Sequence, residues 1–338
     1  MRHCPILAAA AAVLLFGGAG CQVLRERQAL GHYVHGQVLA EQGNADEALA
    51  ELAEAVRRNP KLAVAHAAMG DIHRKKDDPE RARDSYENAC QADPYSFRPH
   101  YNLAVTYQVL AQAARAVAKA EEYIRQAVRV YLRALAIEPT DFESNLNLAA
   151  CYFQLGKSDL AEQYALAAIR IDPNSPQAHS NLGVIYDSQD RLWDAIREYK
   201  ASLELDTQQP QLIMNLGATC MRQQRYQTAI GWFEIAARQD ANLAAAHEQI
   251  GACYFQHRYF EKSLKAYEQA AAVEPGSAAA PRGIGAACMS LYILDRTRLD
   301  LRDRALEAWH RSLELRPDQK DLIQLLQKYT PRESPPQL

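Results

Sequence analysis

The polar residues of this 338-residue chain that could do chemistry do not combine into a catalytic motif. His247 and Glu248 begin like the helical zinc motif H-E-x-x-H, but Gly251 stands where the second histidine ligand would be. Neither G-x-x-x-x-G-K-[ST] nor G-x-S-x-G occurs. Gly283 and Gly285 follow no strand pattern, so they predict close helix packing rather than a phosphate-binding loop. The sequence therefore predicts no enzyme, no cofactor and no metal site.

Cysteine chemistry is not indicated either. Of the seven cysteines, Cys4 and Cys21 belong to the N-terminal segment, and the rest form no C-x-x-C pair. The remaining five are Cys90, Cys151, Cys220, Cys253 and Cys288. The last four recur where a small apolar side chain suits a helix core, which favours buried free thiols. The alternative is one disulfide between neighbouring units, such as Cys220 with Cys253.

One set of amide side chains recurs at a fixed interval, and we call it the amide row. Its members are Asn102, Asn147, Asn181, Asn215 and Gln249, the last four separated by steps of 34 residues. Asparagine is a poor helix former, so its repetition does not follow from core packing. A side-chain amide offers both a donor and an acceptor, which suits the N–H and C=O groups of an extended peptide.

The amide row belongs to a longer pattern with a 34-residue period. Prolines that can end a helix are spaced by 34 residues or its multiples at Pro60 and Pro94, and at Pro139, Pro173 and Pro275. Each period predicts two short amphipathic helices joined by a turn, as at Gly156, where glycine permits a positive φ. A hairpin this short cannot bury its apolar face alone. The copies are therefore expected to stack as a solenoid.

The residue types within one period identify a family. Counted from the first residue of each unit, they are small at position 8, aromatic at 11 and 24, alanine at 20 and 27, and proline at 32. This pattern resembles the tetratricopeptide repeat over residues 29–319. The resemblance implies an all-α solenoid, a right-handed superhelix of eight units. The units are 29–62, 63–96, 97–141, 142–175, 176–209, 210–243, 244–277 and 278–319. A capping helix at 320–329 and a disordered tail at 330–338 are expected to follow.

Two units are longer than the period. The third carries 11 extra residues near 109–119, and the eighth carries 8 near 290–301. The stretch in the third is rich in alanine and free of glycine and proline, which predicts longer helices rather than a loop.

The resemblance also implies where a partner would bind. In this family the first helix of each unit lines the concave side, and position 6, which holds the amide row, points inward. Side chains that could add apolar pockets are Phe153, Met221 and Phe255, and those that could meet carboxylates are Arg74, Arg98 and Arg222. The expected partner is a protein or an extended peptide. The alternative is that the row only repeats the asparagine of the family consensus.

Residues 1–21 differ from the rest of the chain. Arg2 and His3 precede an apolar run of about 11 residues, and Ala19, Gly20 and Cys21 end the segment. The run is too short to span a bilayer and predicts a secretory signal. Small residues before a cysteine resemble the bacterial lipoprotein cleavage site, which implies acylation of Cys21. Residues 22–28 are a polar spacer, and Gln22 in place of aspartate implies an outer-membrane lipoprotein facing the periplasm.

The formal net charge of −3 does not indicate the clustered basic residues that bind nucleic acid.

Together these patterns predict a non-enzymatic scaffold that binds a peptide or protein in the concave groove, in envelope-complex or pilus assembly. Two alternatives stay open: an accessory subunit of an envelope enzyme complex without a groove ligand, and a secreted adaptor that carries no lipid. The sequence does not predict the oligomeric state.

Overall fold

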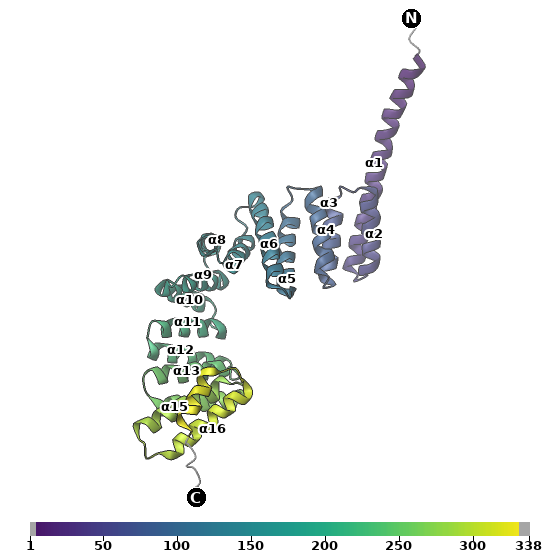
Figure 1. Ribbon diagram of the computed structural model, residues 1–338. Coiled ribbons are helices and arrows are strands. Elements are labelled where there is room, and N and C mark those ends of the chain that lie inside the picture. The colour runs from purple at the N-terminus through teal and green to yellow at the C-terminus, as the bar shows by residue number, and fades with distance from the viewer. Residues whose placement is uncertain (1–4, 331–338) are drawn as a thin grey trace. The chain divides into compact units, whose positions relative to one another are not determined.

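The computed structural model describes the backbone of residues 5–330 and the side chains of residues 22–330. Within this range the chain forms helices and no strand, and successive helices pair as hairpins (Figure 1). The first helices of the hairpins are α1 (Pro5–Glu41), α3 (Ala63–Lys75), α5 (Phe97–Ala113), α7 (Phe142–Gln154), α9 (Pro176–Ser188), α11 (Pro210–Arg222), α13 (Ala244–Gln256) and α15 (Ala279–Leu294). The second helices are α2 (Ala45–Arg58), α4 (Pro79–Ala92), α6 (Val117–Ile137), α8 (Ser158–Ile171), α10 (Leu192–Leu205), α12 (Tyr226–Gln239), α14 (Phe260–Val273) and α16 (Leu299–Leu315). The last helix is α17 (Lys320–Tyr329).

The chain divides into two compact units, Met1–Pro173 and Asn174–Leu338. In the first unit α2, α4 and α6 each pack on the first helix of the next hairpin. In the second unit α10, α12 and α14 do the same, and α16 packs on α17. The prediction of an all-α helical repeat fold is confirmed.

The hairpin turn uses a left-handed residue at position 15 of six repeats. These residues, all with positive φ, are Gly43, Asp77, Gly156, Asp190, Gln224 and Arg258. The next residue closes the helix end: the Arg191 N–H donates to the Tyr186 carbonyl at 2.9 Å, as in a Schellman motif. The expectation of glycine holds at Gly156, whereas four repeats place a longer side chain in a conformation that costs roughly 1–2 kcal/mol per residue.

The two helices of a hairpin approach closely because a small residue faces an aromatic ring. A Cβ atom added to Gly183 would lie 2.5 Å from Tyr199, and one added to Gly217 would lie 2.5 Å from Phe233. Both rings are fully buried. The alternation of small position 8 with large position 24 is therefore the packing contact that joins α9 to α10 and α11 to α12.

The extra residues of the third and eighth repeats lengthen helices, as predicted for the third. Helices α5 and α6 have 17 and 21 residues, against 13 and 14 in α7 and α8. Helices α15 and α16 have 16 and 17 residues. The third repeat thus stays a hairpin, with a short connection at 114–116.

The two ends of the described chain differ. At the C-terminal end, Leu322 and Leu326 of α17 are buried in a cluster with Met289 and Trp309. At the other end α1 continues through residues 22–28, the predicted spacer. The predicted signal segment, with Cys21, and the predicted tail after Thr330 lie outside the residues whose side chains are described. Among the described residues, no helix combines the length and the apolar character needed to cross a bilayer.

We expect Gly183→Ala to destabilise the second unit by about 1–3 kcal/mol, because the added methyl group collides with the Tyr199 ring. Urea denaturation followed by circular dichroism measures the change. Gly231→Ala is the matched control: a Cβ there meets nothing within 4 Å, so it should stabilise helix α12 by about 0.5–1 kcal/mol. Equal effects of both substitutions would contradict the packing contact.

Candidate functional site

The amide of Asn102 is occupied within the first unit. Asn102 is buried on α5, and its Nδ2 donates to Asp71 Oδ1 on α3 at 3.3 Å. The hydroxyl of Tyr86, at position 24 of the preceding repeat, donates to the same oxygen at 2.6 Å. Burial and this bond raise the pKa of Tyr86, so its proton stays on the donor. Asn102 therefore belongs to an internal polar cluster, which the sequence analysis did not foresee.

Asn147 on α7 is also engaged within the first unit. Its side chain interacts with the hydroxyls of Tyr101 and Tyr131, which opposes the rise in their pKa that burial causes. The Tyr131 hydroxyl donates to Gln108 Oε1 at 2.5 Å. Asn147 is half-buried, so it keeps less freedom to reach a ligand than its position in the row suggested.

The other three amides lie in the second unit and differ from these two. Asn181 on α9, Asn215 on α11 and Gln249 on α13 are half-buried. Among the described residues, none of the three side chains has a hydrogen-bond partner, whereas the backbone carbonyl of Asn215 accepts from Thr219 Oγ1. The ring at position 24 before Gln249 is Phe233, which carries no hydroxyl. Three amides thus stand unpaired at the same position of three successive repeats.

The apolar and basic side chains predicted to line the groove differ in how far they are buried or paired within the chain. Phe153 and Met221 are half-buried, and Phe255 leans on Phe260 with ring centroids 5.3 Å apart, so it is partly held in the core. Arg98 is exposed, and no carboxylate of the described chain pairs with it. Of the two other arginines, Arg74 forms an ion pair with Asp71, in which its Nη2 lies 3.7 Å from Asp71 Oδ1.

The side chain of Arg222 forms ion pairs with two aspartates of the preceding repeat. Its Nη1 lies 2.9 Å from Asp187 Oδ2, and its Nη2 lies 2.6 Å from Asp190 Oδ1. The Thr219 hydroxyl donates to Asp187 Oδ1 at 2.8 Å. Arg222, expected to meet carboxylates of a partner, thus meets two carboxylates of the chain itself. The contact joins residues 35 and 32 positions apart, a spacing that only the stacked repeats bring together.

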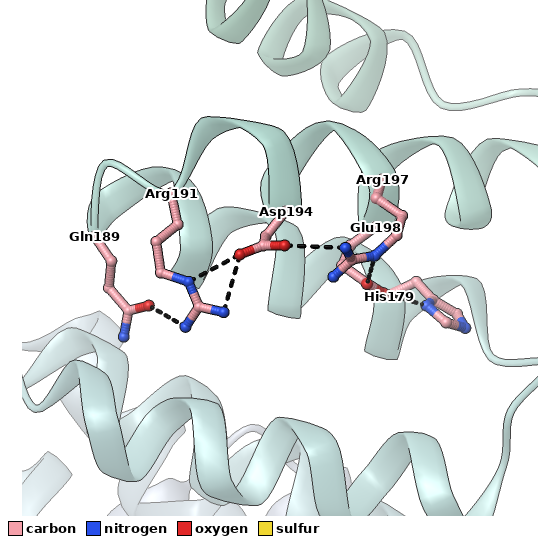
Figure 2. Close-up of polar contacts among 6 residues, drawn as sticks. All are labelled: His179, Gln189, Arg191, Asp194, Arg197 and Glu198. Carbon is pink, nitrogen blue, oxygen red and sulfur yellow. Dashed lines mark hydrogen bonds and ion pairs between the residues drawn. The ribbon is translucent and has the colours of Figure 1, made fainter.

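A second polar network holds the hairpin of α9 and α10 (Figure 2). Asp194 accepts from Arg191 and pairs with Arg197 at 3.0 Å, and these contacts lower its pKa. Arg197 Nε also donates to Glu198 Oε1 at 3.1 Å. The other oxygen of Glu198 lies 2.8 Å from His179 Nδ1, with both side chains largely buried. His179, at position 4, thus has a structural partner, and the same contact recurs between His32 and Glu51 at 2.6 Å.

The thiols of the repeats are not reactive groups. All five cysteines from Cys90 onward are free, so the alternative disulfide between Cys220 and Cys253 is wrong. Burial raises the pKa of Cys151 to about 12 and that of Cys253 and Cys288 to about 11. A thiolate is the nucleophilic form, so these side chains act as small apolar core residues. The described residues also contain no cluster of three or more potential metal ligands.

Residues 44–235, more than half of the chain, match the family model of the C-terminal ARM domain of tetratricopeptide repeat protein 21. The chain belongs to this family. The tetratricopeptide resemblance drawn from positions 8, 20, 24 and 32 is thereby supported at the level of the family.

Solved structures share the tetratricopeptide fold. The C-terminal part of a TPR repeat-containing protein from Cytophaga hutchinsonii superposes with a TM-score of 0.60 and 18% identity, covering 75% of this chain and 97% of that one. The APC/C hetero-tetramer Cut9–Hcn1 matches with a TM-score of 0.50 and 15% identity, covering 85% of this chain and 53% of that one. These identities show the fold alone. A search of curated protein sequences finds no match.

The burial of the thiols predicts how they respond to Ellman's reagent. With Cys4 and Cys21 replaced by serine, we expect the half-exposed Cys90 to react first at pH 8, and the other four only on unfolding. Because the folded pKa lies above the reference value of 9.0, the neutral thiols stabilise the fold fully below pH 9. That contribution is lost as pH rises toward 11, so the thermal midpoint should fall over this window. Rapid reaction of four or five thiols in native buffer would contradict the burial.

Proposed function

We propose that this chain is a non-enzymatic scaffold and that its second unit binds an extended peptide segment of a partner protein. The observation that carries the proposal is the unpaired state of Asn181, Asn215 and Gln249 among the described residues. A half-buried amide without a partner loses hydration and gains nothing in return, so a ligand that supplies both a donor and an acceptor is favoured there.

The energetics set the kind of ligand. Each amide–peptide hydrogen bond contributes about 0.5–1.5 kcal/mol, so three contribute about 1.5–4.5 kcal/mol. Ordering an extended peptide costs a comparable amount, and the amides alone give weak binding. Partner side chains must supply the rest, and the half-buried Met221 on α11 is one apolar side chain that they could contact. The amides would then set the position of the peptide backbone, while side-chain contacts would set its sequence.

We further propose that the chain is exported and held on a membrane through acylated Cys21. The support is the sequence of residues 1–21, with its apolar run and the small residues before the cysteine. Two or more acyl chains anchor a protein stably where one is marginal. A scaffold held in this way suits envelope-complex or pilus assembly at the periplasmic face of the outer membrane.

We expect Asn215→Ala with Gln249→Ala to weaken the binding of peptides selected from a random library on the full chain. Loss of two hydrogen bonds of about 1 kcal/mol each raises the dissociation constant roughly tenfold or more. Isothermal titration calorimetry measures it. The control is Gln227→Ala with Gln269→Ala, which removes two exposed amides from second helices α12 and α14. The thermal midpoint should stay nearly unchanged in both variants. Equal affinity of the two variants would exclude the amide site.

We expect Cys21→Ser to move the chain from the membrane fraction to the soluble fraction of its host, because no acyl chain can then attach. Fractionation followed by immunoblotting measures the distribution. The control is Cys90→Ser, which removes a thiol from the repeats and should leave the chain with the membranes. Continued sedimentation of the Cys21→Ser chain with membranes would exclude acylation as the anchor.

A further inference from the structure

The first helix of the array exposes a position that every later repeat buries. Position 10 is at most 5% exposed in the seven later repeats, at Ile72, Thr106, Cys151, Ile185, Thr219, Cys253 and Ala287. In the first repeat the residue at position 10 is Val38, and it is 43% exposed. Within each of the two compact units the first helix of a repeat packs on the second helix of the preceding repeat, as α3 packs on α2, and Ile72 lies in one apolar cluster with Leu52 of α2. No described hairpin precedes α1, so Val38 has no such cover among the described residues.

The side of α1 that carries Val38 is exposed and apolar along several turns. Val38, Val34 and Leu30 are 43%, 58% and 48% exposed, and Val23 is 62% exposed. Spacings of four and seven residues place these side chains in one line along the helix. The buried residues of α1, such as Ala29 and Leu39, lie on its opposite side. We call Val23, Arg27, Leu30, Val34, Val38 and Glu41 the α1 stripe.

The stripe carries one charge of each sign, placed symmetrically. Arg27 lies seven residues before Val34, and Glu41 lies seven residues after it. Both side chains are exposed, and neither has an ionic partner among the described residues. A second α1 helix running antiparallel, with Val34 opposite Val34, would place Arg27 of each copy opposite Glu41 of the other. Leu30 would face Val38 in the same register. A parallel pair would instead bring arginine to arginine and glutamate to glutamate.

The other end of the array favours this pairing over a chain of copies. Leu322 and Leu326 of α17 fill the apolar face beside Trp309, so the last repeat offers no open face of the kind that α1 presents. Among the described residues, the apolar face of the last repeat that a head-to-tail copy would pack on is therefore covered. A surface that meets its own copy about a two-fold axis closes after two chains.

We propose that two copies of this chain form a dimer through antiparallel packing of their α1 stripes, with Val34 on the two-fold axis. Three apolar side chains from each copy are removed from water, and two Arg27–Glu41 ion pairs fix the register. The dimer rests on neither the peptide site nor the lipid anchor. It would present two peptide-binding units in one particle.

Charge reversal tests the register. The protein is the full chain carrying Cys21→Ser, so that acyl chains do not contribute, and sedimentation velocity gives its mass over a range of concentrations. Arg27→Glu alone, or Glu41→Arg alone, should raise the dimer dissociation constant by at least about tenfold, because like charges then face each other. The double variant Arg27→Glu with Glu41→Arg should restore the dimer. Arg25→Glu, the same charge change on the opposite side of α1, should have no effect.

A second variant tests the contact itself. Val34→Glu places a carboxylate on the axis and should give a monomer with an unchanged circular dichroism spectrum, since the side chain is exposed in a single chain. A wild-type chain that sediments as a monomer at every concentration would overturn the proposal, even if that monomer binds lipid vesicles through α1. Failure of the double variant to restore the dimer would overturn it as well.

Discussion

The structure depends on one contact, the packing of a position-24 side chain against the small residues of first helices. Tyr267 shows it in both directions: a Cβ atom added to Gly251 in its own repeat would lie 2.9 Å from the ring, and one added to Gly283 in the next repeat would lie 2.4 Å away. One ring thus fills the space within a hairpin and between two hairpins. Burial of such rings is the main apolar gain that holds the short helices together. The fold follows from repeating this contact.

The same contact decides what happens to the side chain at position 6. Because that side chain lies beside the ring of the preceding repeat, a tyrosine hydroxyl can bring it into an internal polar cluster. Tyr86 and Asn102 share Asp71 in this way, and Tyr131 interacts with Asn147. Phe233 offers no hydroxyl to Gln249. A tyrosine at position 24 is not enough by itself, because Tyr199 precedes Asn215 and no described residue pairs with that amide, whereas Asp71 joins Tyr86 to Asn102.

The apolar surface at the C-terminal end of the repeat array is covered by a helix, whereas the surface at the N-terminal end is partly exposed. A single amphipathic helix, α17, buries Leu322 and Leu326 and covers the last hairpin. Among the described residues, helix α1 packs on α2 and makes a few contacts with α3, and it keeps an apolar line exposed. In a solenoid each repeat is stabilised by its neighbours, so an end repeat needs a polar outer face or a cover. That asymmetry is a physical constraint on any assembly that this chain forms.

The sequence by itself determined the fold, because its signals are local and repeat. Glycine at position 8, the aromatic at 24 and the closing prolines specify one hairpin, and the 34-residue period specifies the stacking. The longer α5 and α6 followed from helix propensity, and the buried state of Cys151 and Cys253 followed from their place in the repeat. The amides of the candidate site were found in the same way, as a column in the repeat.

Only the tertiary structure decided which of those residues are free to act. Asn102 and Asn215 stand at the same position of their repeats. The side-chain amide of Asn102 donates to Asp71, whereas no described residue forms a hydrogen bond with the side chain of Asn215. Arg222 was predicted to await a carboxylate and instead holds Asp187 and Asp190. These partners come from the neighbouring repeat, more than 30 residues away, and the identity of a partner there is not encoded in the local pattern. The exposure of Val38 likewise depends on the tertiary structure: no described helix covers it, whereas α2 covers Ile72 at the same position of the next repeat.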